Sequence, residues 1–136
     1  HYFSYLGAMA FPNIRPTPAQ PGAIMDTVSA LGPGDVVLAI TFAHYSAEIV
    51  RAAEIARATG ARVVALTDAA DAPVATGAWR IFEMPMAGPG LMPSLATGFH
   101  LVEWMVAEMA ARTPEAADRI ADFETRILRL GGYVSR

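Results

Sequence analysis

The sequence contains neither cysteine nor lysine, and these two absences remove several kinds of chemistry. Without cysteine there is no disulfide bond, no thiol nucleophile and no sulfur-ligated metal site. All ten basic residues are arginine, so the chain also lacks the lysine needed for a Schiff base or for a phosphate-binding loop of the nucleotide-binding type. Any reaction or binding must therefore use hydroxyl, carboxylate, imidazole, guanidinium or backbone groups.

Long apolar runs and basic clusters are also missing. No apolar run reaches the roughly 18 residues that a membrane-spanning helix needs, and the chain does not open with a secretory signal. The net charge is -3, so these residues alone should not bind nucleic acid appreciably. We therefore predict a soluble, cytoplasmic protein that does not contact membranes.

The size and composition fit one domain over residues 1–136. An apolar fraction of 54% is enough for a full core, or for a core and a buried interface. Residue 1 is histidine, and residues 1–10 have the pattern of a helix body without a start. We therefore expect the parent protein to extend upstream.

The central stretch of the chain is residues 35–60. An apolar run of strand length at 35–42 leads through a short polar loop into a segment of helical period that ends at Gly60. Further strands are predicted at 61–66 and 80–84, so strands alternate with helices as in a parallel α/β sheet. Ligands of such sheets bind beyond the carboxyl ends of the strands, which here is the loop from Thr41 to Ser46.

Helices are predicted at 1–10, 24–31, 94–112 and 114–130, and the proline-rich segment 11–22 allows at most a short edge strand at 13–15. Ser94 is the predicted cap of the long helix, which has one apolar core stripe: Leu95, Phe99, Val102, Val106 and Met109. The last helix has a narrow apolar seam: Ile120, Phe123, Ile127 and Leu130. It also has two predicted charge pairs spaced four residues apart, Glu115 with Arg119 and Asp122 with Arg126. This seam predicts a dimer contact over 114–130, although it could also pack on its own domain.

Three linked segments resemble a known family: Ala39-Ile40-Thr41-Phe42-Ala43-His44-Tyr45-Ser46-Ala47-Glu48, Ala52-Ala53-Glu54-Ile55-Ala56-Arg57 and Gly60-Ala61-Arg62-Val63-Val64-Ala65-Leu66-Thr67-Asp68. They are similar to the sugar isomerase (SIS) domain, and most of all to its version at the C-terminus of RpiR-type bacterial transcription regulators. The resemblance covers about residues 26–112. It implies a flavodoxin-like, three-layer fold with a five-stranded parallel sheet that binds a phosphosugar. The family's central first strand and its serine-bearing turn should precede His1, so the given residues alone would leave a gap in the sheet.

The family's ligand loop reads roughly Ser-x-Ser-Gly-x-Thr. Here Thr41 and Ser46 keep the outer hydroxyls, while Ala43 replaces the middle serine and His44 replaces the glycine. The resemblance implies that Thr41, His44 and Ser46 contact an anionic ligand, helped by the backbone amides of residues 44–46, which include Tyr45. The alternative is structural: Ser46 only caps the helix, and His44 is a solvated loop residue.

Three further residues are candidates for ligand binding, each with a structural alternative. Thr67 ends the next strand, where Asp68 could simply form the turn. Ser94 opens the long helix and could be only its cap. His100, one turn later, could be a packed or interface residue instead of a ligand contact.

The leading hypothesis is an effector-sensing, dimerising regulator domain that binds a small anionic ligand, in particular a sugar phosphate, and reaches DNA only through an upstream helix-turn-helix domain. The alternative is a phosphosugar isomerase, which would need a base such as Glu48, Glu83, His44 or His100. The sequence supplies no supported catalytic pair, so we predict no catalytic residue, metal ligand or cofactor. A ligand-free interaction module is the third possibility.

Overall fold

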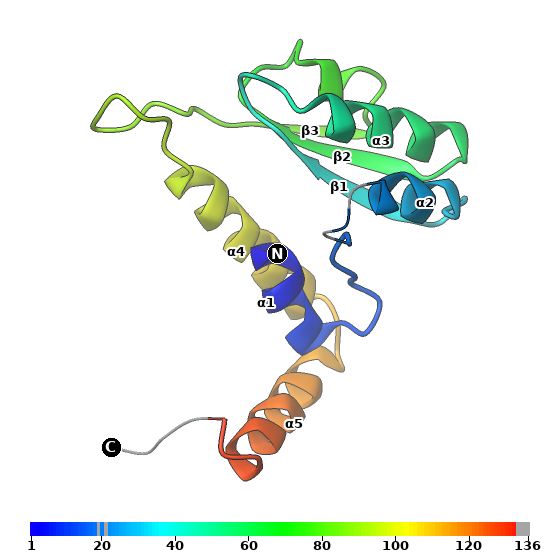
Figure 1. Cartoon of the computed structure of the whole chain (residues 1–136). Coiled ribbons are helices and arrows are strands. Elements are labelled where there is room, and N and C mark those ends of the chain that lie inside the picture. Colours follow the sequence, from blue (N-terminus) through cyan, green and yellow to red (C-terminus); the bar gives the residue numbers. More distant parts are fainter. Residues whose placement is uncertain (19, 21, 133–136) are drawn as a thin grey trace. The chain divides into compact units, whose positions relative to one another are not determined.

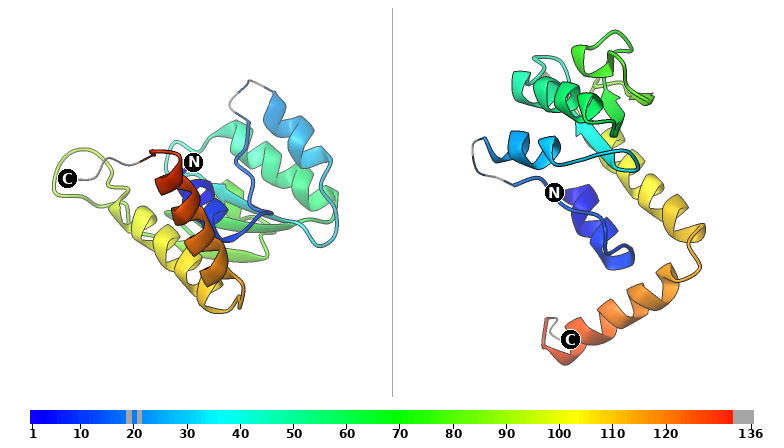
Figure 2. Two further views of the ribbon diagram at one scale, coloured as in Figure 1. Left: turned by 90° about the horizontal axis from the view of Figure 1, so that it is seen from below. Right: turned by 90° about the vertical axis from the view of Figure 1, so that its right-hand side faces the viewer.

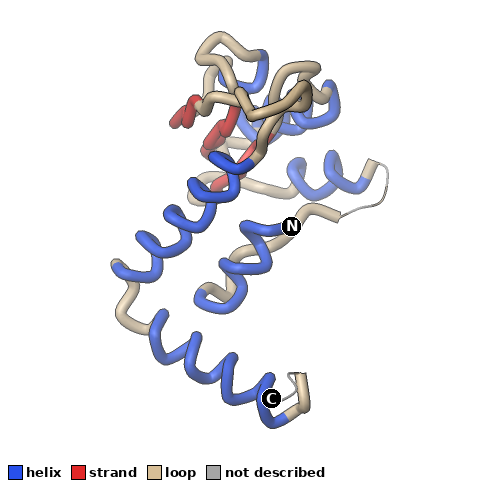
Figure 3. Tube along the Cα trace, turned by 90° about the vertical axis from the view of Figure 1, so that its left-hand side faces the viewer, coloured by secondary structure: helices blue, strands red, loops and turns tan. Residues whose placement is uncertain are grey.

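The computed structural model describes residues 1–18, 20 and 22–132. The chain divides into two compact units: one contains residues 17–98, and the described part of the other contains residues 1–16 and 99–132. All three strands belong to the first of these, whereas the second is helical (Figure 3). We refer to them as the sheet unit and the helical unit. The assignment of residues 1–136 to one SIS-type domain stays a prediction.

The sheet unit is built on three parallel strands in the order β1 (Val36–Ile40), β2 (Arg62–Thr67) and β3 (Arg80–Glu83) (Figure 1). Helices α2 (Ala23–Ser29) and α3 (Ala47–Ala58) precede and follow β1, and a 3-10 turn, η1 (Pro73–Ala75), lies between β2 and β3. The predicted parallel α/β fold is therefore confirmed.

Small side chains explain how closely α3 packs on the sheet. Its buried face consists of alanines, among them Ala52, Ala53 and Ala56, and they contact the same core as Val63 and Ala65 of β2. Without bulky side chains the helix backbone can approach the strands, which fixes where its first turn lies. Helix α2 packs beside α3 (Figure 2).

Strand β1 is much less buried than β2. All of β2 except Arg62 is buried, but Val36 is 57% exposed and Ile40 is 40% exposed. The three strands are consecutive, so the gap implied by the family resemblance does not fall between them. No strand in the described part of the chain pairs with the outer edge of β1, and the expected edge strand at 13–15 does not form.

The helical unit contains α1 (Tyr2–Ala10), α5 (Ala116–Arg129) and all but the first turn of α4 (Ala96–Ala111). Ala10, Phe11 and Ala116 form its buried core, with Ile14 and Ile120 packed against them. Gly7 leaves room for Ile14 in this contact, because a methyl group there would lie 2.5 Å from Cδ1 of Ile14 and that side chain would have to move. Helix α1 is thus held against the first half of α5.

Several details of the C-terminal helices were predicted wrongly. Helix α5 begins at Ala116 instead of Pro114, because Pro114 and Glu115 form a turn that is closed by a hydrogen bond from the Ala116 N–H to the Thr113 carbonyl oxygen. The predicted stripe of α4 is mostly open, since Phe99 is 48% exposed and only Val102 is buried. Neither predicted charge pair of α5 forms an ion pair in the part of the chain that the structure describes; the salt bridge found there joins Arg112 and Glu108.

No helix among the described residues is both long enough and apolar enough to cross a membrane.

Candidate functional site

The loop between β1 and α3 lies at the carboxyl end of the sheet. Its first residue, Thr41, is buried, and its Oγ1 accepts a hydrogen bond from the Ser46 N–H at 3.0 Å. The Ser46 hydroxyl in turn accepts one from the Ile49 N–H at 3.4 Å and caps α3. The hydroxyls of Thr41 and Ser46 therefore fix the two ends of the loop through these hydrogen bonds.

His44 stands at the tip of this loop in a left-handed backbone conformation. Its φ of 66° makes it the one residue other than glycine with positive φ among those described. The family's loop has glycine at this point, and glycine adopts such a conformation without steric cost. The backbone path of a glycine turn is thus kept here with an imidazole on it, and the side chain is exposed.

Asp68 joins the end of β2 to this loop. Its Oδ2 accepts a hydrogen bond from the Ala43 N–H at 3.1 Å, and its Oδ1 accepts one from the Thr67 hydroxyl at 3.4 Å. Thr67 itself is fully buried, so its hydroxyl supports Asp68 instead of facing solvent. The sequence placed Asp68 at a strand end but not among the ligand contacts; the parallel arrangement of β1 and β2 was the signal for this juxtaposition.

Tyr45 is affected by the same carboxylate. The pKa of the Tyr45 phenol is raised, and partial burial is the largest cause. The charge of Asp68, a hydrogen bond to Asp68 and the charge of Asp71 follow in decreasing order. Each of these effects opposes a negative charge on the phenol oxygen. The Tyr45 hydroxyl therefore keeps its proton to a higher pH than an ordinary tyrosine does.

Some donors of the loop remain open. No hydrogen bond of the His44, Tyr45, Ala47 or Glu48 amide is found within residues 1–18, 20 and 22–132. These amides lie at the amino end of α3, where the helix dipole favours an anion. Ala43, His44 and Ser46 are exposed, so protein atoms do not cover this end of the helix.

The remaining two candidates are not joined to the loop by hydrogen bonds in the described structure. Ser94 makes local contacts: its hydroxyl accepts from the Ala96 N–H at 3.3 Å, as expected of a residue that starts α4. Gly98, one turn on, is close to Met84 and to Phe42 of the loop, which brings the start of α4 near the site. His100 is exposed and belongs to the helical unit.

The described residues include no group of three histidine or carboxylate side chains arranged to hold a metal ion. The arrangement instead offers hydroxyls, amides and one carboxylate, which suits a polar, anionic small molecule. The individual ligand contacts of Thr41, Ala43, His44, Tyr45, Ser46, Thr67, Ser94 and His100 stay predictions.

Solved structures that resemble this chain include the following three. The RpiR transcription factor of Sphaerobacter thermophilus (sugar isomerase domain) matches with 26% identity and a TM-score of 0.77, over 92% of this chain and 72% of that one. The NanR protein of Vibrio vulnificus, complexed with ManNAc-6P, matches with 20% identity and a TM-score of 0.75, over 98% of this chain and 54% of the NanR chain. A candidate phosphosugar isomerase of Salmonella typhimurium matches with 23% identity and a TM-score of 0.62, over 87% and 37%.

The matches to NanR and to the candidate isomerase show the fold alone. This chain spans about half the length of NanR and less than half the length of the candidate isomerase. No protein of curated function matches the sequence. The SIS domain model, however, matches residues 12–101, which is more than half of the chain and includes the whole loop from Thr41 to Ser46. On this match, and on the parallel sheet with its loop at the carboxyl edge, the chain belongs to the SIS domain family.

Proposed function

We propose that this chain is the effector-sensing and dimerising domain of an RpiR-type transcription regulator, and that its effector is a sugar phosphate. The observation that carries the proposal is the open amino end of α3, where four amides lack partners in the described structure and Thr41 and Ser46 fix the loop around them. The phosphate group binds these amides and the Ser46 hydroxyl.

The neighbouring Asp68 restricts the ligand. Its carboxylate already accepts the Ala43 amide, so the phosphate group must sit toward residues 44–48. A carboxylate so close to a phosphate would repel it, whereas sugar hydroxyls can donate hydrogen bonds to it. The sugar ring therefore lies between the phosphate and Asp68.

One solved structure supports the regulator, and another supports the sugar-phosphate ligand. The structural match of higher identity is to the sugar isomerase domain of an RpiR transcription factor, and NanR was solved with ManNAc-6P bound. DNA binding would come from an upstream helix-turn-helix domain, and the dimer from α5. A difference in ligand affinity between two dimer arrangements would then set the size of the response.

A phosphosugar isomerase is the second candidate, because one structural neighbour is a candidate enzyme of that kind. Proton transfer between adjacent carbons needs a positioned base. Glu48 and His44 are both exposed at the loop, and neither has a hydrogen-bond partner for its side chain among the described residues. This is weak support for catalysis, and we favour the sensor.

A thermal-shift screen tests the proposal. ManNAc-6P and other hexose phosphates should raise the melting temperature, while the unphosphorylated sugars should not. The double variant His44→Ala with Ser46→Ala should lose this stabilisation but keep its secondary structure. Ser29→Ala, which removes an exposed hydroxyl of α2 bonded to the Asp26 carbonyl, is the matched control and should respond like the parent.

Two results would contradict the proposal. Stabilisation that persists in the double variant would move the site away from this loop. Conversion of an aldose phosphate to its ketose by the purified chain would favour the isomerase.

A further inference from the structure

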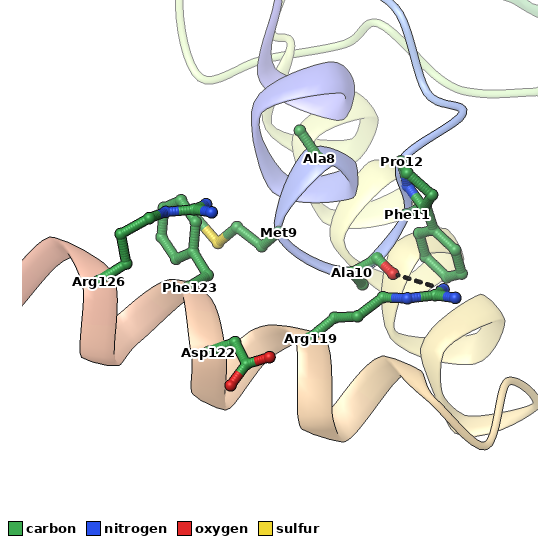
Figure 4. A pocket seen from close by; sticks show the side chains of 9 residues that line it. All are labelled: Ala8, Met9, Ala10, Phe11, Pro12, Arg119, Asp122, Phe123 and Arg126. Carbon is green, nitrogen blue, oxygen red and sulfur yellow. Dashed lines mark hydrogen bonds between the residues drawn. The ribbon is translucent and has the colours of Figure 1, made fainter.

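The helical unit contains a cavity of about 300 Å³ between α1 and α5 (Figure 4). Its walls come from the end of α1, from the residues directly after it and from one face of α5. None of the eight residues predicted to contact a sugar phosphate lines it. The cavity is therefore separate from the loop at the end of β1.

One wall of the cavity is apolar. Met9 extends from α1 toward the Phe123 ring of α5, and Phe11, which is buried, lies at the other end of the pocket beside Arg119 (Figure 4). A sugar phosphate has no apolar group to cover this wall. An aromatic ring or a short alkyl group would remove it from water and gain the corresponding hydrophobic free energy.

Two arginines bring positive charge to the same cavity. Arg126 lies with its guanidinium carbon 5.8 Å from the centre of the Phe123 ring, and Arg119 donates one hydrogen bond, at 3.3 Å, to the carbonyl oxygen of Ala10. Neither arginine forms an ion pair in the described part of the chain. Most of their N–H groups are consequently available to an anion.

Asp122, between the two arginines along α5, reduces the net formal charge of these three side chains to +1. A monoanion matches this charge better than a phosphate dianion does. Guanidinium groups bind the planar carboxylate with two parallel hydrogen bonds. The volume is at the lower end of the range of ligand sites, enough for one ring and an acid group.

We propose that the cavity between α1 and α5 binds a small monocarboxylic acid with an apolar body about as large as a benzene ring. The carboxylate pairs with Arg126, and the apolar body lies against Met9 and Phe123. This site is independent of the sugar-phosphate site, so either can exist without the other.

Methyl-labelled methionine gives a direct test on the whole chain. The Met9 methyl signal, identified by its loss in Met9→Leu, should shift in a saturable way when phenylacetate is added. The methyl signal of Met92, a residue that is 80% exposed in the loop before α4, should stay unchanged. The neutral analogue 2-phenylethanol should bind at least tenfold more weakly, and phenyl phosphate should bind no more tightly than phenylacetate.

Variants separate the proposed contacts from general surface charge. Arg126→Gln should weaken phenylacetate binding at least tenfold, and Arg126→Lys should weaken it less. Arg112→Gln, which removes an exposed arginine outside the cavity, should change it by less than twofold. The proposal is overturned if Met9 does not respond, if the alcohol or the phosphate binds better than predicted, or if Arg126→Gln binds like the parent.

Discussion

At the scale of single residues, His44 shows most clearly how the site departs from a simple glycine loop. Its backbone adopts φ 66°, a conformation that places Cβ of an ordinary residue too close to its neighbours. The loop thus keeps a strained residue at the point where a ligand would approach. Strain of this kind persists only where the surroundings hold it, here through the hydrogen bonds of Thr41, Ser46 and Asp68.

Replacing His44 should reveal this strain. His44→Gly is expected to be more stable than His44→Ala by about 1 kcal/mol, because only the alanine variant carries a Cβ at positive φ. Urea denaturation of the two variants measures the difference. An alanine variant as stable as the glycine variant would mean that the loop relaxes to another conformation.

Tyr45 and Asp68 make a second prediction at this scale, on pH. The raised pKa of Tyr45 means that the folded chain keeps the phenol proton at a pH where the unfolded chain, near the ordinary value of 10.0, has begun to lose it. The stabilisation is therefore complete below about pH 10 and is lost as the pH rises through the higher, folded value.

Ultraviolet absorbance of the phenolate measures this pKa, with Tyr45→Phe subtracted because the chain has four tyrosines. Asp68→Asn should lower the pKa of Tyr45 toward 10.0 and flatten the fall of stability above that pH. An unchanged titration in Asp68→Asn would show that Asp68 does not raise the pKa of Tyr45 and would leave burial and Asp71 as its causes.

At the scale of elements, Ser46 at the start of α3 has two roles, helix capping and proposed ligand binding. It caps the helix through the Ile49 amide, and in our proposal it also donates its hydroxyl to a phosphate. The sequence alone could not separate these roles, because either would place serine at this position.

Two substitutions separate them. Ser46→Ala should cost about 1 kcal/mol of stability through loss of the cap, whereas Ser46→Asp should retain most of the stability because aspartate caps equally well. The aspartate variant should nevertheless lose sugar-phosphate binding, since it puts a negative charge where the phosphate binds. Melting temperatures with and without ligand check both effects; an aspartate variant that still binds would assign Ser46 to capping only.

The elements also show what could be predicted from sequence. The unit from Asp35 to Gly60 was recognised correctly, because the change from strand to helical period is strong and Ser46 marks the helix start. The start of α5 was placed two residues early because Thr113-Pro114 looks like a cap, although the chain makes a turn there. The contact from Asp68 to Ala43 spans 25 residues and depends on how β1 and β2 pair, which local patterns do not contain.

At the scale of the whole molecule, the question is what covers the apolar residues that the described chain leaves open. The second half of α5 is one such region: Leu130 is 73% exposed, and Phe123 and Ile127 are only half-buried. Within the predicted seam, α1 packs against Ile120 and its Met9 extends toward Phe123, so Ile127 and Leu130 are the part that α1 leaves open. A dimer through α5 remains our proposal for the rest.

Two leucines of α5 and its C-cap provide a matched test. Leu130→Glu lies on the seam and should shift the chain from dimer to monomer in light scattering. Leu128 is 64% exposed at the same end of the helix but does not belong to the seam. The variant Leu128→Glu should therefore leave the dimer intact. If both variants remain dimeric, the dimer forms through another surface.

The uncovered outer edge of β1 has a practical consequence. Valine and isoleucine stand exposed on a strand whose backbone N–H and C=O groups lack a neighbour among the described residues on that side. Such an edge can template the addition of further strands from other molecules. Purified preparations of this polypeptide should therefore become turbid as they are concentrated, and a charged substitution such as Ile40→Lys should keep them clear.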